Sequence, residues 1–254
     1  MLTIFRLVFA PPRDLILLGV AGWIGLALAD NRAGRSGFDA RVLDNLAFAL
    51  TAAFLIGGRF FYAAEHLSVF VQSTLSLISP NTALFDNWGG LTVAGITGFV
   101  FGQRNKLALW PTLDALTPLL ATLAVGLGFS HLASGAAFGK ETDLPWAWQL
   151  WGANRHPTQV YEIIAALLIL GFTWFRKRKL KPGGDFLSFV VLTSGSRLII
   201  EAFRGDSTLV LGGLRVAQVS AWIILALSLL GLERVVFPTD IPSPETKRKS
   251  NIQK

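Results

Sequence analysis

Seven stretches of mostly apolar residues divide this 254-residue chain, and they leave it few ways to fold. Hydrophobic residues make up 52% of the chain and charged residues only 15%, a composition typical of integral membrane proteins. A helix of about 17–25 apolar residues can cross the hydrocarbon core of a bilayer while satisfying its own backbone hydrogen bonds. The sequence therefore predicts an all-α integral membrane protein with about seven transmembrane helices, at residues 14–30, 43–64, 89–103, 109–134, 157–175, 184–204 and 216–236.

These runs are predicted to form one polytopic domain, residues 1–236, followed by a disordered basic cytoplasmic tail, residues 237–254, rich in Pro, Ser and Lys. The run at 89–103 is short and rich in glycine, so it either packs tightly against its neighbours or is partly re-entrant. The run at 14–30 ends in small residues compatible with signal-peptide cleavage. The count of seven spans instead requires that this segment be retained.

Basic residues are distributed unevenly among the loops. Fifteen of the 23 Lys and Arg residues fall in alternate loops and in the C-terminal tail, and only five fall on the opposite side. Positively charged loops stay in the cytoplasm, so this asymmetry predicts the N-terminus outside and the C-terminus inside, although Arg6 and Arg13 favour the reverse. Because topology accounts for the distribution of the basic residues, we expect a lipid bilayer and no nucleic acid as partner.

Two loop segments are predicted to lie on the outer membrane surface as short interfacial elements. Residues 65–88 alternate apolar and small polar groups and contain no Lys or Arg, which suits an amphipathic element. Residues 139–156 contain three tryptophans, and tryptophan is enriched at the level of the lipid headgroups.

The predicted orientation gathers the ionisable side chains of the spans at the outer leaflet. Arg59 and His131 lie near the outer ends of the second and fourth runs. In the sixth run, Arg197, Glu201 and Arg204 have the spacing i, i+4 and i+7, which is one face of a helix. A charged residue costs roughly 2.5–3.5 kcal/mol at the bilayer centre on insertion scales, so such residues commonly mark a functional site.

Arg197 is a candidate for binding a phosphate, because a guanidinium group can pair with a phosphate through two parallel hydrogen bonds. Glu201 cannot satisfy both neighbouring arginines fully. The simpler reading of Glu201 is a buried ion pair that locks the fifth and sixth helices together.

The fifth run begins with the polar octapeptide Arg155-His156-Pro157-Thr158-Gln159-Val160-Tyr161-Glu162. Proline is favoured as the first residue of a helix, and the free N–H groups there attract an anion. Gln159 and Glu162 share a helix face, with Tyr161 beside them. The alternative reading is a helix cap with an aromatic anchor, and His131 and His156 each also fit the role of an interfacial histidine.

The three histidines lack the spacing of metal ligands, so the sequence predicts no metal and no cofactor. The chain also has no cysteine. Any sulfur chemistry must therefore use the thiol of a partner.

At these residues the chain resembles the prolipoprotein diacylglyceryl transferase family of bacterial inner-membrane enzymes. The octapeptide is similar to the family's R-H-P-[ST]-Q-L-Y-E, and residues 138–146 are similar to Y-G-[KR]-P-T-D-L-P-W. Residues 197–204 resemble R-x-x-x-E-x-x-R, residues 89–93 resemble G-G-L-S-F, and Gly58-Arg59 resembles part of G-A-R. The resemblance covers roughly residues 43–236.

The resemblance implies transfer of the diacylglyceryl group of phosphatidylglycerol to the lipobox cysteine thiol of a preprolipoprotein. The reaction would take place at the outer leaflet of the bacterial inner membrane and release glycerol phosphate. The implied partners are phosphatidylglycerol and the lipobox peptide. Arg197 matches an arginine that the family needs.

The chain departs from the family pattern at several positions. Ala94 stands where the family has a histidine, Gly128 where its signature has an arginine, and Thr193 where it has a tyrosine. His131 takes the place of a signature asparagine, and we predict that it replaces the missing base, with His156 as the second candidate. The predicted catalytic residues are therefore His131, His156 and Arg197, and the predicted substrate-binding residues are Arg59, Arg155, Gln159, Tyr161, Glu162, Glu201 and Arg204.

Two other functions stay open at this point. One is a catalytically impaired or re-purposed relative that binds an anionic lipid with the same arginines. The other is a lipid or small-anion transporter, although the sequence has no inverted repeat.

Overall fold

The computed structural model describes residues 13–36, 39–72, 84–176, 180–210 and 213–236. Within these ranges the chain forms seven helices of 18 residues or more and one short helix. They are α2 (Arg13–Ser36), α3 (Ala40–Glu65), α4 (Leu67–Gln72), α5 (Asn87–Arg104), α6 (Leu109–Ser134), α7 (Thr158–Phe175), α8 (Gly184–Glu201) and α9 (Val216–Val236). The predicted tail at 237–254 and much of the segment at 65–88 lie outside the described residues.

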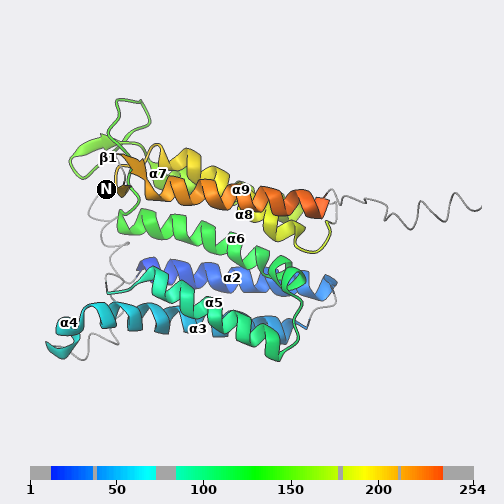
Figure 1. Cartoon of the computed structure of the whole chain (residues 1–254). Coiled ribbons are helices and arrows are strands. Elements are labelled where there is room, and N and C mark those ends of the chain that lie inside the picture. The colour runs from blue at the N-terminus through cyan, green and yellow to red at the C-terminus, as the bar shows by residue number, and fades with distance from the viewer. Residues whose placement is uncertain (1–12, 37–38, 73–83, 177–179, 211–212, 237–254) are drawn as a thin grey trace, which may run out of the picture.

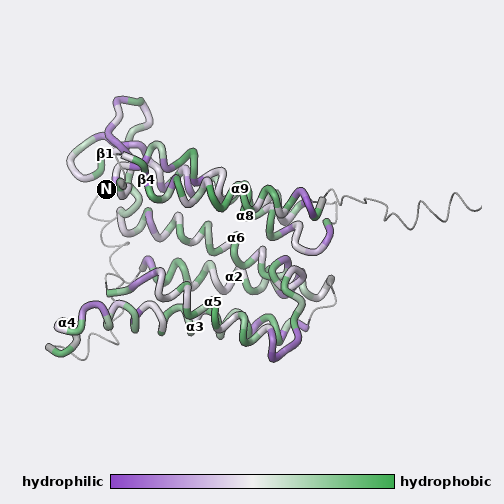
Figure 2. Tube along the Cα trace, viewed as in Figure 1, coloured by the Kyte–Doolittle hydropathy of each residue, from purple (hydrophilic) through white to green (hydrophobic). Residues whose placement is uncertain are grey.

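Five of these helices, α2, α3, α6, α7 and α9, are long and apolar enough to cross a membrane. Apolar residues dominate the middle of the bundle, and polar residues gather toward its two ends (Figure 2). Helix α5 is rich in glycine, and α8 carries Asp185, Arg197 and Glu201. These two helices have 18 residues each and lie alongside the five apolar ones (Figure 1). The helical class is thus confirmed, and the chain is a multi-pass membrane protein.

The helices lie side by side and alternate in direction (Figure 1). Helix α6 packs against α2 on one side and against α7 and α8 on the other, while α5 pairs with α3 and α9 pairs with α8. This alternation brings the C-terminal ends of α3, α6 and α8 to the same end of the bundle as the beginnings of α5 and α7 (Figure 1). We refer to it as the hairpin end, because two short β-hairpins lie there.

Small residues allow the closest helix contacts. A Cβ atom at Gly126 of α6 would overlap the Cβ of Ala21 on α2. A Cβ atom at Gly57 of α3 would lie 2.6 Å from the Cβ of Val93 on α5. Glycine at such positions lets two backbones approach, which is how helices associate in membranes. Of the two expectations for residues 89–103, tight packing is therefore the one that the structure confirms.

Acidic side chains begin several of these helices. The Asp39 carboxylate accepts a hydrogen bond from a backbone N–H in the first turn of α3, and Asp86 does the same for α5. Asp114 of α6 accepts from two backbone N–H groups at the start of α8, at 2.6 and 2.8 Å. These contacts satisfy N–H groups that have no partner within their own helix.

Helix α2 is longer than predicted and runs on to Ser36. Polar residues after Asp30 suggested an end there, but Ala29 and Ala33 are fully buried in the core. The Arg32 guanidinium donates to the Thr173 carbonyl of α7 at 3.2 Å and forms an ion pair with Asp185 of α8. Asp185 thus stabilises the charge of Arg32, a residue that the sequence alone predicts to lie in a loop.

The predicted interfacial segment at 139–156 contains a β-hairpin, which the sequence analysis did not anticipate. Strand β1 (Trp148–Leu150) pairs antiparallel with β2 (Ala153–Arg155). Trp151 and Gly152 both have positive φ, as a tight two-residue hairpin turn requires. A second hairpin joins β3 (Leu209–Val210) to β4 (Leu214–Arg215).

Helix α8 ends at Glu201, three residues earlier than predicted. The chain then turns toward the first hairpin, where the Lys140 N–H donates to the Phe203 carbonyl and the Gly205 N–H donates to the Phe138 carbonyl, both at 2.8 Å. The prediction that Arg204 lies on the same helix as Arg197 and Glu201 is wrong. The hydrogen bonds to residues 138 and 140 turn the chain away from the helix before Arg204.

Candidate functional site

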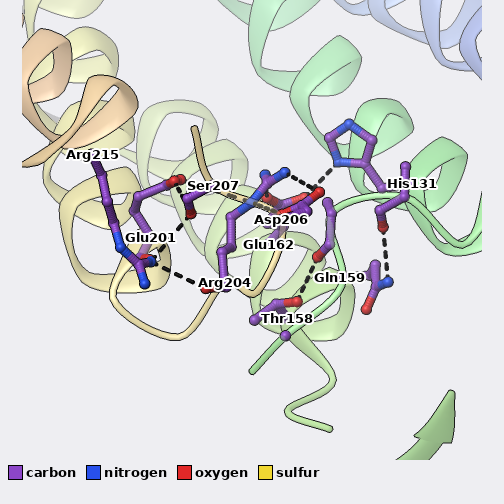
Figure 3. A network of polar contacts seen from close by, with 12 residues as sticks. His131, Thr158, Gln159, Glu162, Glu201, Arg204, Asp206, Ser207 and Arg215 are labelled. Atoms are coloured by element: carbon purple, nitrogen blue, oxygen red, sulfur yellow. Dashed lines mark hydrogen bonds and ion pairs between the residues drawn. The ribbon is translucent and has the colours of Figure 1, made fainter. Parts of the chain in front are cut away.

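Glu162, in the first turns of α7, is the centre of a polar network at the hairpin end (Figure 3). One carboxylate oxygen lies 2.7 Å from Nδ1 of His131 on α6. The other accepts from Nη1 of Arg197 and from Nη1 of Arg204, both at 3.1 Å. The side chain of Glu162 is 13% exposed. A single carboxylate therefore connects α6, α7, α8 and the segment after α8.

Glu201 of α8 is a second buried carboxylate in the network, and Arg197 links it to Glu162. The Glu201 side chain is 1% exposed and pairs with Nη2 of Arg197 at 3.0 Å. The Ser207 hydroxyl donates to its other oxygen at 2.5 Å. Because a buried charge needs compensating partners, this arrangement explains how α8 carries Glu201. The predicted ion pair between the fifth and sixth runs exists, but Glu162 rather than Glu201 makes it.

Arg204 is held by carboxylates on several sides. Its Nε and Nη2 atoms donate to the two oxygens of Asp206, both at 2.9 Å, in addition to the contact with Glu162. The Nε atom also lies 3.8 Å from Glu201. The side chain is only 11% exposed. Arg204 therefore fastens the segment after α8 to the network and has little surface left for a ligand.

Arg215 reinforces the same segment from β4. Its guanidinium donates to the backbone carbonyls of Glu201 and Arg204 and to the Ser207 hydroxyl. Figure 3 shows these contacts on the side of Glu201 away from His131. Carbonyl groups at the end of a helix lack intrahelical partners. Arg215 supplies one and stabilises the end of α8.

Arg155, a predicted binding residue, is engaged in holding its own loop together. Its three nitrogens donate to the carbonyls of Leu150 and Gly139 and to the Glu141 carboxylate, at 3.1–3.4 Å. Its guanidinium also lies 5.2 Å from the centre of the Phe138 ring, a cation–π distance.

His156 and Tyr161 lie in an aromatic cluster with Phe203. The His156 and Phe203 ring centres are 5.1 Å apart, and the His156 Nδ1 atom is 3.4 Å from the Tyr161 hydroxyl. Trp146 Nε1 donates to the same hydroxyl at 3.0 Å. These contacts match the aromatic-anchor reading of the octapeptide.

Thr158 and Gln159 bind the loop after α6. The Thr158 hydroxyl donates to the Ala137 carbonyl at 2.5 Å, and the Gln159 amide donates to the Ala136 carbonyl at 2.8 Å. Both residues are buried. Together they place the end of α6, and with it His131, against the start of α7 (Figure 3).

Arg59 lies on the α3–α5 pair. Its Nη1 donates to the Leu84 carbonyl at 2.6 Å. Arg59 lies near the C-terminal end of α3, which is at the hairpin end (Figure 1); that this end faces outward stays a prediction. This hydrogen bond to Leu84 is separate from the Glu162 network.

A groove between α6, α7 and α8 opens from this network, and the space in it and at its open mouth amounts to about 560 Å³. Its polar residues include His131, Glu162 and Arg197, and most of the others are small or apolar. The Arg197 side chain is 36% exposed. The groove therefore combines a polar end, fit for an anionic headgroup, with an apolar length, fit for hydrocarbon.

Sequence reasoning missed three residues of the network, namely Asp206, Ser207 and Arg215. The proximity of Asp206 to Arg204 in the chain is a weak signal for a pair. Arg215 reaches the network only because the second hairpin places it there. The spacing of residues in the sequence gives no sign of that contact.

The fold and the groove define a multi-pass helical membrane protein with a polar site at one end of its bundle. Residues 15–233 match the family model for prolipoprotein diacylglyceryl transferase. The chain therefore belongs to the prolipoprotein diacylglyceryl transferase family.

Individual relatives are similar over nearly the whole length. A phosphatidylglycerol–prolipoprotein diacylglyceryl transferase of Thermosynechococcus vestitus is 30% identical over 243 residues, which cover 87% of each chain. Enzymes of the same name are 31% identical in a Synechocystis strain, covering 87% of this chain and 83% of the relative, and 26% identical in Prochlorococcus marinus, covering 91% and 89%.

Proposed function

We propose that this protein transfers the diacylglyceryl group of phosphatidylglycerol to the lipobox cysteine of a preprolipoprotein. We place the reaction at the outer leaflet of the bacterial inner membrane, with the hairpin end outside and the C-terminus in the cytoplasm. Family membership supports the reaction class, and the distribution of basic loops supports the orientation.

The observation that carries the proposal is the position of Arg197 in the groove. Of three arginines predicted in the site, Arg155 and Arg204 donate through all of their guanidinium nitrogens to carbonyls and carboxylates. Arg197 also pairs with Glu162 and Glu201. Arg197 lines the groove and is the most exposed of the three. We therefore assign the phosphate of the lipid to Arg197 alone, and a structural role to Arg155 and Arg204.

His131 is the proposed base. Its Nδ1 atom faces Glu162 at 2.7 Å, and a carboxylate in that position favours the tautomer with a proton on Nδ1 and a free lone pair on Nε2. The same arrangement orients the histidine of hydrolase triads. A histidine so placed can act as a general base toward a thiol.

The reaction exchanges one carbon–oxygen bond for one sulfur–carbon bond and moves one proton. His131 Nε2 takes the proton of the cysteine thiol, and the thiolate attacks the glyceryl carbon that carries the phosphate ester. A sulfur–carbon bond forms while the carbon–oxygen bond breaks, and glycerol phosphate leaves with the bonding electrons. Arg197 stabilises the charge on that phosphate, and the proton on His131 is available to the departing group.

The test is transfer in vesicles. Purified protein in phosphatidylglycerol vesicles should increase the mass of a lipobox peptide by one diacylglyceryl group, whereas a peptide with serine in place of cysteine should stay unchanged. Arg197→Gln should lower the transfer rate by about 10²-fold or more, the typical effect of removing a donor to developing charge. Arg197→Lys should recover little, because a lysine ammonium lacks the planar fork of donors.

Arg155→Gln provides the matched control. Because Arg155 holds its loop and does not line the groove, this change should lower the melting temperature but affect transfer less than Arg197→Gln does. If the wild-type protein binds anionic vesicles through Arg197 but transfers nothing, the chain is a lipid-binding relative and the proposal is wrong.

A further inference from the structure

Ser207, in the segment between α8 and β3, connects two charged residues of the network. Its hydroxyl donates to Oε1 of Glu201 at 2.5 Å, and the hydroxyl oxygen accepts from Nη1 of Arg215 at 3.2 Å (Figure 3). A guanidinium group can only donate hydrogen bonds, and an ionised carboxylate can only accept them. The single proton of the hydroxyl must therefore point at Glu201, so the direction of both hydrogen bonds is fixed.

The Glu201 carboxylate lies between two arginines. Its Oε2 atom is 3.0 Å from Nη2 of Arg197 and 3.8 Å from Nε of Arg204. The Glu201 side chain is 1% exposed, so water has little access to replace a lost partner. Among the described residues, Ser207 is the hydrogen-bond donor to Oε1. Without this hydroxyl, the buried Oε1 atom would lose its partner and the carboxylate would be free to turn away from Arg197.

The orientation of Arg197 depends on carboxylates more than on packing. Its side chain is 36% exposed in the groove, and its two terminal nitrogens pair with Glu162 and Glu201 at 3.1 and 3.0 Å. A guanidinium group binds a phosphate best when its planar donors are aligned with the phosphate oxygens. A group that fixes the Glu201 carboxylate therefore also affects how well Arg197 can receive an anion.

We propose that Ser207 is a positioning residue for Arg197. Its hydroxyl orients the Glu201 carboxylate, and Glu201 in turn holds the Arg197 guanidinium at the polar end of the groove. The inference rests on the proposed function, because that function gives Arg197 the phosphate of the lipid. It adds a residue from outside the groove to the machinery of transfer, and it gives the segment after α8 a role beyond packing.

The experiment is a double-mutant cycle in the vesicle transfer assay, with rates expressed per folded protein. Ser207→Ala should lower the transfer rate about 10-fold, the lower end of the range for a hydrogen bond to a charged group. In the Arg197→Gln background no guanidinium is left to position, so the same change should lower the rate by less than about twofold.

Three further variants make the comparison specific to the hydroxyl. Ser207→Thr keeps the hydroxyl and should retain most of the transfer rate. Ser207→Val has the shape of threonine without the hydroxyl, and it should lose as much activity as Ser207→Ala. Ser228→Ala removes a buried hydroxyl that is bonded within α9 at 3.0 Å. It is the matched control and should leave the rate unchanged.

The cycle distinguishes a positioning role from a structural one. The effects of independent changes multiply, so a structural hydroxyl would lower the rate by the same factor with and without Arg197. That result, or a wild-type rate in both Ser207→Ala and Ser207→Val, would show that the inference is wrong. If the wild-type protein transfers nothing, the proposed function fails instead. The affinity for dihexanoyl phosphatidylglycerol, measured by calorimetry on the same four proteins of the cycle, then tests Ser207 with the same expected factors.

Discussion

Glu162 receives donors from three parts of the chain, and this sharing links the proposed chemistry to the packing. One oxygen holds His131 and the other holds Arg197 and Arg204. A residue that positions a base and a cation together cannot be replaced without moving both. The separate contributions of its partners are therefore better measured by changing each partner alone.

Replacing His131 by glutamine should remove the base and keep a side chain that can still bond to Glu162. We expect transfer to fall by about 10²–10⁴-fold, the range for a positioned acid–base group, while lipid binding persists. The measurement is the initial rate of peptide modification at saturating lipid.

His156→Gln is the control for that change. His156 contacts Phe203 and Tyr161 rather than Glu162, so we expect a smaller effect on transfer. A normal rate in His131→Gln would contradict the assignment of the base.

At the scale of elements, the distance between α6 and α7 controls the site, because His131 and Glu162 lie on these two helices. The contact is close at Gly128. A Cβ atom there would lie 2.7 Å from Cγ1 and 3.2 Å from the backbone N of Ile163 on α7. The same close approach excludes an arginine at this position without separation of the two helices. Glycine is what this packing requires.

Gly128→Ala should therefore push α6 and α7 apart and weaken the contact between His131 and Glu162. Overpacking of this kind typically costs about 1–3 kcal/mol, so we expect a lower melting temperature and a transfer rate reduced by about tenfold or more. Gly171→Ala on α7 is the matched control, because nothing lies within 4 Å of a Cβ atom there. A Gly128→Ala protein with wild-type stability and rate would show that the spacing of these helices is less constrained than the structure indicates.

At the scale of the whole molecule, the alternating helices bring the end of α6, the start of α7 and the end of α8 to one end of the bundle (Figure 1), and the polar network lies on these segments. The side of the membrane on which this end lies follows from the basic loops and is part of the proposal. The absence of cysteine from the chain makes the orientation simple to measure, since any cysteine introduced is the only one present.

Asp143→Cys, beside the first hairpin, should react with a membrane-impermeant maleimide added to intact cells from which the outer membrane has been removed. Lys181→Cys, between α7 and α8 at the other end, should react only after the membrane is opened. Both residues are exposed, so accessibility within the protein does not limit either reaction. Labelling of the second site alone in intact cells would reverse the orientation and move the site to the inner leaflet.

The apolar runs by themselves predicted the seven long helices that the structure describes. Residues 109–134 and 216–236 were predicted with the boundaries that α6 and α9 have, because a membrane span must be long, apolar and internally hydrogen-bonded. The sequence also determined which polar residues share an end of the bundle, since alternating spans bring every second helix end together. Motif resemblance identified the family, and the comparisons confirmed it.

Tertiary structure decided what each polar residue does. Arg155, Arg197 and Arg204 are chemically equivalent in the sequence, yet Arg155 holds a loop, Arg204 pairs with Asp206, and Arg197 lines the groove. Hydrogen bonds between the segments around residues 140 and 203 end α8 early, and no local pattern encodes them. Helix periodicity reports contacts within a few turns of chain, whereas the partners of a buried charge come from elements that only packing brings together. That is why spans and family could be read from the sequence, while the choice among three arginines required the fold.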